Sequence, residues 1–152
     1  MPFASSIVCN TILRRGFNEH IDITPMKLQK LVYLTCSEYA KLTDRALIDE
    51  DFAVWQYGPV LPSVYHEFKS YGAAPIRQYA KDAEGRAQAI NEDSMPSLKK
   101  AIEAIWSRYK NFSGAELSRI THQNGSGWSH AYNHENSRIS FQEMKDDNAY
   151  DR

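Results

Sequence analysis

The sequence predicts a mainly α-helical fold: a compact helical domain that carries a small antiparallel β element. Two segments, residues 25–42 and 95–110, repeat apolar residues every three or four positions, as one face of a helix does. Phe52–Tyr57 is rich in aromatic and β-branched residues and stops at Gly58 and Pro59. That pattern is typical of a short strand near 52–57 that ends in a turn.

The first two helices are expected over residues 4–18 and 25–42. Thr24 can cap the second helix with its side-chain oxygen, and Pro25 suits the first helical position because no amide donor is needed there. The apolar residues of this helix share one face, as in an amphipathic helix packed on a core. That face consists of Leu28, Leu31, Val32, Thr35, Tyr39 and Leu42, and the residues largely off it are Lys27, Lys30, Glu38 and Lys41.

A third helix should begin at Pro62 and end near Gly72, since glycine tolerates the left-handed backbone that closes many helices. Beyond it, two short and partly alternating segments flank a polar turn, which predicts a hairpin near 76–90. Paired with the strand near 52–57, this hairpin would complete a small antiparallel sheet.

Serines mark the starts of the later helices. Ser94 is expected to cap the helix of residues 95–110, and Ser113–Glu116 is a capping box ahead of a short helix that ends near His122. The polar residues 145–152 are expected to fray.

Composition excludes several classes of protein. A chain of 152 residues with 42% hydrophobic content fits one domain, residues 1–152, with a real core. The net charge of −1 gives no global attraction to nucleic acid or to an acidic membrane. Cys9 and Cys36 are too few for a disulfide framework or a typical zinc site, so we expect reduced, buried thiols. Without a signal peptide or a long apolar stretch, the protein is expected in the cytoplasm.

Two motifs indicate a family. The segments Met26–Tyr33 (MKLQKLVY) and Trp55–Val60 (WQYGPV) resemble the Panacea domain of SocA-like antitoxins and phage-associated GepA-like proteins, and the resemblance spans about residues 24–135. Where that family commonly has proline before its late tryptophan, this chain has Gly127. Further matching residues are Tyr65, Phe68, Leu117, Thr121, His122, Gln123 and Trp128.

The resemblance implies an antitoxin of bacterial or phage origin that neutralises a cognate toxin by direct protein contact. The toxin would be encoded by an adjacent gene, and a protease could act downstream on the delivered toxin. We expect the strand end at Gln56–Val60 and the loop Thr121–Trp128 to lie close together and to form or border the toxin-binding face. The candidate partner-binding residues are Trp55, Gln56, Tyr57, Gly58, Pro59, His122 and Trp128. Core packing is the competing explanation for the aromatic residues.

Catalysis and metal binding find little support in the sequence. His122, His130 and His134 lack the paired cysteines or the Glu-x-x-His spacing of metal sites. Ser126 lies in Gly-Ser-Gly without a strand-to-helix setting, and no glycine-rich phosphate loop is found. We therefore expect no catalytic residue, no cofactor and no metal.

A DNA-binding regulator is the alternative function. Ala115–Ala131 has the pattern of a helix-turn-helix, two short helices around a glycine turn. However, no lysine or arginine lies between Arg119 and Arg138, although contacts with phosphates dominate DNA affinity. Binding of nucleic acid by the protein alone is therefore not expected.

Overall fold

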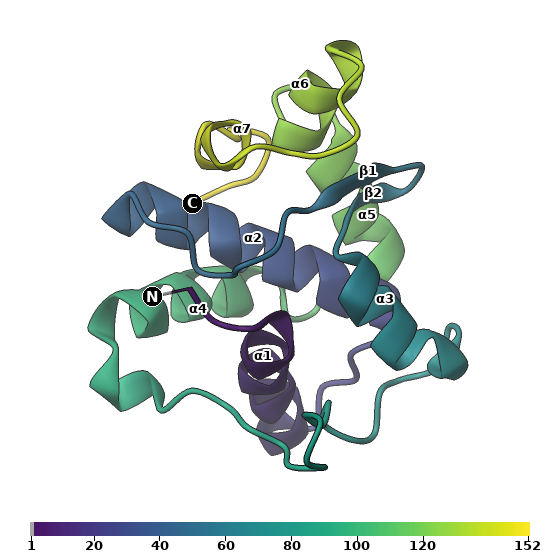
Figure 1. Ribbon diagram of the computed structural model, residues 1–152, viewed down its shortest axis with the longest axis vertical. Coiled ribbons are helices and arrows are strands. Elements are labelled where there is room, and N and C mark those ends of the chain that lie inside the picture. Colours follow the sequence, from purple (N-terminus) through teal and green to yellow (C-terminus); the bar gives the residue numbers. More distant parts are fainter. Residues whose placement is uncertain (1) are drawn as a thin grey trace.

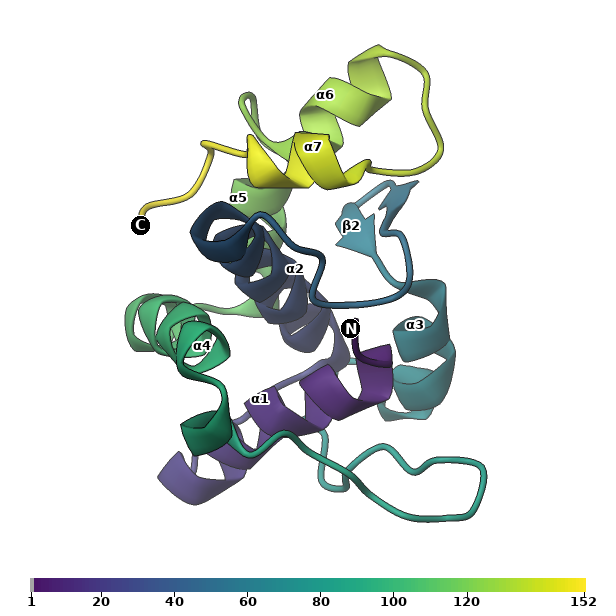
Figure 2. The same cartoon turned by 60° about the vertical axis from the view of Figure 1, so that its left-hand side comes forward.

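The computed structural model describes residues 2–152, and its central element is the helix α2, Pro25–Thr43. In Figure 2, α1 (Ser5–Glu19), α4 (Pro96–Tyr109) and α7 (Phe141–Lys145) lie around it, with α5 (Gly114–His122) behind. All four pack against α2. The remaining helices are α3 (Pro62–Phe68), α6 (Gly127–Asn133) and two short 3₁₀ turns, η1 (Lys69–Tyr71) and η2 (Glu92–Ser94).

Because neighbours surround α2, its polar residues are not on a solvent face. Lys27, Lys30 and Glu38 are all buried, so the amphipathic pattern predicted for this helix is wrong for them. Each is compensated by a polar contact: for example, Lys27 donates its ammonium to the carbonyl of Lys110. The buried lysines therefore depend on tertiary partners, which a helical pattern does not show.

Helix ends follow the sequence signals in most places. The Thr24 side chain accepts from the Lys27 amide at 3.3 Å, and Ser113 and Glu116 form the predicted capping box. The third helix ends earlier than predicted: α3 stops at Phe68, and Gly72, with a positive φ of 60°, follows η1 instead. The cap predicted at Ser94 is wrong, because Ser94 belongs to η2 and α4 begins only at Pro96, after Met95.

The β element is a hairpin of two three-residue strands, β1 (Ala53–Trp55) and β2 (Gly58–Val60), paired antiparallel. The strand expected near 52–57 is thus present but ends at Trp55. Gly58 and Pro59 do not form its closing turn; they begin the second strand, and Gln56 and Tyr57 make the turn instead. The prediction of a mainly helical fold with a small antiparallel β element is confirmed.

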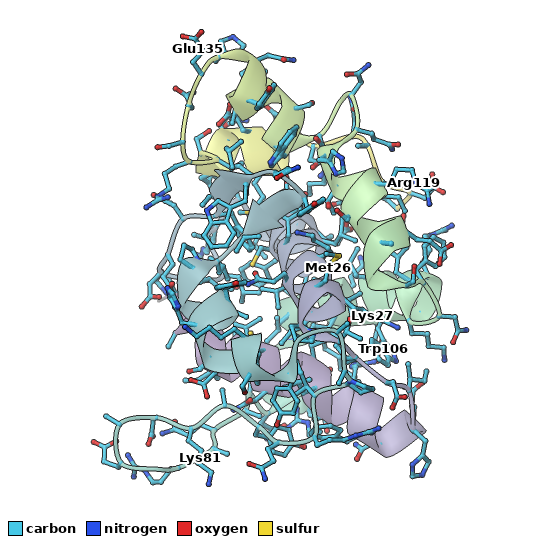
Figure 3. The ribbon with its side chains drawn as sticks, turned by 90° about the vertical axis from the view of Figure 1, so that its right-hand side faces the viewer. Met26, Lys27, Lys81, Trp106, Arg119 and Glu135 are labelled. Atoms are coloured by element: carbon cyan, nitrogen blue, oxygen red, sulfur yellow. The ribbon has the colours of Figure 1, made fainter. Side chains whose placement is uncertain are left out.

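The hairpin predicted near 76–90 is wrong, because this segment forms no strand. The chain does turn back, but the Asn10 side chain of α1 takes the hydrogen bonds that a strand ladder would use. Its oxygen accepts from the Ala80 amide at 2.8 Å, and its nitrogen donates to the carbonyls of Ala80 and Gln88 at 2.9 Å. Lys81 marks this loop in Figure 3.

The C-terminal residues pack onto α2, so the expectation that residues 145–152 fray is wrong. Asp147 and Tyr150 are buried. Tyr33 donates its hydroxyl to Asp147 at 2.7 Å, and the hydroxyls of Tyr150 and Ser37 lie 3.0 Å apart. These bonds attach the C-terminal residues to α2, close to the C-terminus seen in Figure 1.

One hydrophobic cluster runs from Val8 to Tyr150 and contains the buried free thiols Cys9 and Cys36. Burial raises the pKa of both thiols far above the ordinary value. Across residues 2–152, no helix combines the length and the apolar character needed to cross a membrane.

Candidate functional site

The β hairpin is attached to α2 through two polar residues of the MKLQKLVY segment, Gln29 and Lys30. Gln29 is buried and uses both ends of its amide: it donates to the Leu61 carbonyl at 3.0 Å and accepts from the Leu61 amide at 2.9 Å. Lys30, only 1% exposed, donates to the carbonyl of Pro59 at 3.0 Å. Burial lowers the pKa of the Lys30 ammonium to about 7.

Two further helices hold the other side of the hairpin. Ser118 of α5 donates its hydroxyl to the Tyr57 carbonyl, and Trp128 of α6 donates its indole N–H to the Trp55 carbonyl at 2.8 Å. Side-chain donors therefore bond the carbonyl of every second residue along this segment: Trp55, Tyr57, Pro59 and Leu61. The helices thus fix the hairpin backbone, although a two-stranded hairpin is only marginally stable alone.

Gly58 is required by this arrangement for two reasons. Its φ of 113° lies in a region that side chains rarely adopt. A Cβ at this position would also lie 3.2 Å from the Thr121 hydroxyl and 3.3 Å from the Lys30 nitrogen. The glycine of the WQYGPV motif therefore allows α2 and α5 to approach the hairpin from both sides.

A groove of about 640 Å³ lies between the start of α2, the hairpin and α3. Figure 3 shows Met26 at the start of α2, between α3 and α5. Several large side chains at the groove remain exposed: Met26, Trp55, Tyr57 (60% exposed) and Tyr65. The rings of Trp55 and Tyr65 meet edge to face with centroids 5.2 Å apart. The other lining residues are Pro25, Gln29, Lys30, Gln56, Val60, Val64, Lys69 and Gly72.

A second aromatic cluster consists of His122, Trp128 and Tyr132, on α5 and α6. The Trp128 ring stacks on Tyr132 with centroids 4.9 Å apart and meets His122 edge to face at 5.3 Å. Tyr132 is 60% exposed. The bond from Trp128 to Trp55 connects this cluster to the hairpin.

The structure brings the two predicted segments together. Trp55, Gln56 and Tyr57 are exposed, and they line the groove. Gly58 and Pro59 are buried, and His122 and Trp128 are half-buried. The predicted residues thus comprise exposed ones, which a partner could touch, buried ones, which shape the backbone, and two half-buried ones, His122 and Trp128.

Sequence reasoning missed other residues of the groove. Met26, Gln29, Lys30 and Lys69 were not among the candidates, although all line it. Met26, Gln29 and Lys30 lie in the first family motif and Tyr65 is a further matching residue, so the motif itself was the available signal. Their role depends on which helix face the hairpin covers, which periodicity alone does not give.

The histidines and the α5–α6 pair are the residues that a metal site or a DNA-binding helix-turn-helix would use. Within residues 2–152, no three His, Cys, Asp or Glu residues are placed to hold a metal ion. His130 and His134 stack at 4.2 Å, and His130 bonds Glu143 at 2.5 Å, whereas His122 packs on Trp128. The second helix of the pair, α6, carries no lysine or arginine.

Comparison with known proteins gives a family for this arrangement. Residues 28–129 match the family described as "Antitoxin SocA-like, Panacea domain". The protein named Antitoxin SocA from Caulobacter vibrioides (strain NA1000 / CB15N) is 27% identical over 124 residues. The match covers 80% of this chain and 66% of that relative, slightly less than two thirds of its length. No solved structure gives a significant match. The matched range includes both motifs that hold the hairpin, apart from the first two residues of MKLQKLVY, and it covers more than half of the chain, so this chain belongs to the SocA-like antitoxin family of Panacea domains.

Proposed function

We propose that this chain is an antitoxin that neutralises a cognate protein toxin by binding it directly. The observation that carries the proposal is the family match over residues 28–129, and the relative from Caulobacter vibrioides is itself named an antitoxin. In this proposal the chain occludes the toxin or holds it in an inactive form and catalyses no reaction. Residues 1–152 act as one binding unit.

The proposed contact face is the groove together with the neighbouring aromatic cluster. Its support is the exposure of Trp55, Tyr57 and Tyr65 next to a concave surface, because buried aromatic anchors in pockets dominate the energy of many interfaces. The rigid attachment of the hairpin adds to this, since a surface already held in one conformation loses less entropy on binding. Gly58 and Pro59 would act from beneath this face, by fixing its backbone.

The proposed biological setting is that of a toxin–antitoxin pair. The toxin would be encoded next to this chain, and the two proteins would meet in the cytoplasm. A protease that degrades the delivered toxin is the proposed downstream partner.

Co-expression with the adjacent reading frame tests the proposal. We expect the neighbouring protein to arrest growth when expressed alone, and the arrest to be relieved by this chain, which should co-purify with it. Tyr57→Ala should weaken relief and co-purification, whereas Lys81→Ala, on the distant loop of residues 76–90, should not (Figure 3). Failure of the wild-type chain both to bind the neighbour and to relieve arrest would refute the proposed function.

A further inference from the structure

The groove has an uneven charge. Its lining residues include two lysines, Lys30 and Lys69, and no aspartate or glutamate. Lys69 is exposed, immediately after α3, and Lys30 lies in the wall formed by α2. Since the whole chain has a net charge of only −1, this local excess of positive charge is a property of the groove rather than of the protein.

The Lys30 ammonium has spare hydrogen-bonding capacity. An ammonium group has three N–H donors, and the hydrogen bond found for Lys30 among residues 2–152 is the one to the Pro59 carbonyl. Burial is the cause of its lowered pKa, and no acidic neighbour opposes it. An anion arriving in the groove would favour the protonated form of this amine and would be attracted to it across a low-dielectric wall.

The remainder of the groove is apolar. Met26, Trp55, Tyr57 and Tyr65 are exposed around it, and Val60 and Val64 line it. Exposed aromatic rings gain the most favourable free energy when another apolar or aromatic side chain packs against them. The groove therefore offers apolar contact and positive charge within one concave surface.

We propose that the groove binds a short segment of the cognate toxin in which an acidic side chain lies next to an apolar or aromatic one. The apolar side chain packs against Trp55, Tyr57 and Tyr65, and the carboxylate faces Lys69 and Lys30. A basic segment would be repelled by Lys69 and would oppose protonation of Lys30, and a wholly apolar segment would leave the charge of Lys69 uncompensated. This inference rests on the proposed function, because it names the chemistry of the toxin surface at the same site.

The test uses a charge reversal on the groove and a matched reversal outside it. Lys69→Glu changes an exposed side chain at the rim, and Lys100→Glu makes the same change at an exposed position on α4. The first probe is a library of short random peptides displayed on phage and selected on the wild-type chain. We expect the selected peptides to contain Asp or Glu beside an apolar residue. Lys69→Glu should weaken their binding by about tenfold or more, and Lys100→Glu should leave it unchanged.

The second probe is the purified toxin identified by co-expression, measured by titration calorimetry against the same variants. Lys30→Met should also weaken this complex. If loss of the hydrogen bond to Pro59 makes Lys30→Met fold poorly, the exposed variant Lys69→Glu still tests the charge of the groove. Replacing the contacting acid of the toxin with lysine should restore affinity for Lys69→Glu. Restoration would identify a direct charge pair.

The outcomes separate the two proposals. Selected peptides without acidic residues, or a toxin bound equally well by Lys69→Glu and by the wild type, overturn the inference while the antitoxin function stands. Self-association of the wild-type chain that Lys69→Glu abolishes, without peptide or toxin binding, assigns the groove to a second copy and also overturns it. If no toxin binds the wild-type chain, the proposed function itself fails.

Discussion

The indole N–H of Trp128 donates to the carbonyl of Trp55 at 2.8 Å, between two residues that lie 73 positions apart in the sequence. This bond joins the aromatic cluster of α5 and α6 to the exposed end of β1. It belongs to a set in which side chains of α2, α5 and α6 hold the backbone of one small hairpin. Hydrogen bonds thus connect residues of the family motifs, although only some of these residues are exposed.

Trp128→Phe tests that link. Phenylalanine keeps a ring against His122 and Tyr132 but cannot donate to the Trp55 carbonyl. We expect a loss of about 1 kcal/mol in the free energy of unfolding, with faster hydrogen exchange at the hairpin amides. Tyr132→Phe is the matched control, since that residue is largely exposed and its hydroxyl has no hydrogen-bond partner within residues 2–152. Equal exchange in Trp128→Phe and wild type would mean that the bond contributes nothing to hairpin stability.

Leu31→Ala and Ile105→Ala test the core between α2 and α4. Both side chains are buried, so truncation should cost about 2–5 kcal/mol, which urea unfolding can measure. Arg119→Ala, on the exposed side of α5, should change the free energy of unfolding by less than about 0.5 kcal/mol. Small losses for the two apolar variants would show that α2 and α4 are turned differently.

Lys30 should make stability depend on pH. Its pKa is about 7 in the folded chain and would return to the ordinary 10.5 on unfolding. Between these values the unfolded chain binds more protons, so the free energy of unfolding rises with pH; below about pH 7 the amine is charged in both states and the burial cost is fully present.

Lys30→Met removes this titration. The stability of the wild type relative to Lys30→Met should therefore rise from about pH 7 upward, by at most about 1.4 kcal/mol per pH unit. Urea unfolding of both proteins at several pH values gives the difference, in which the other titrating groups largely cancel. A difference independent of pH would show that the buried amine remains charged.

Asp147→Ala tests the attachment of the C-terminal residues. The buried carboxylate accepts from the Tyr33 hydroxyl at 2.7 Å and from the Gly127 amide at 3.0 Å. Its removal leaves both donors without an acceptor and should cost about 1–3 kcal/mol in thermal or urea unfolding. Asp146→Ala, at the exposed neighbouring position, is the control and should cost less than about 0.5 kcal/mol.

Sequence predicted the elements whose signals are local. The Thr24–Pro25 start and the Ser113 capping box depend on residues within one turn, and both are confirmed. The prediction of a hairpin near 76–90 was wrong because the backbone of this segment bonds to the side chain of Asn10, some 70 residues away. The prediction that Lys30 lies off the buried face of its helix was wrong for a similar reason: whether a lysine on a helix is buried depends on what packs over it.

The candidate site could be predicted only as a pair of segments. The WQYGPV motif predicted one strand of the hairpin and not its partner, and the Thr121–Trp128 segment was predicted to lie beside it. Neither indicated the groove wall formed by Lys30 and Tyr65. Which motif residues are exposed also depends on tertiary packing. Gly58 and Tyr57 are adjacent in the motif, yet one is buried and the other exposed.

Gln56→Ala and His122→Ala separate the groove from the aromatic cluster as the toxin-binding face. Gln56 is exposed in the hairpin turn and lines the groove, so its removal should weaken toxin binding while the melting temperature stays within a few degrees. His122 is half-buried, contacts the Ser118 carbonyl and packs on Trp128, so His122→Ala should also lower the melting temperature. Calorimetric titration with the toxin and thermal unfolding of each variant give the two quantities. If both variants bind the toxin as the wild type does, the interface lies elsewhere, most simply on the outer face of α1 or α4.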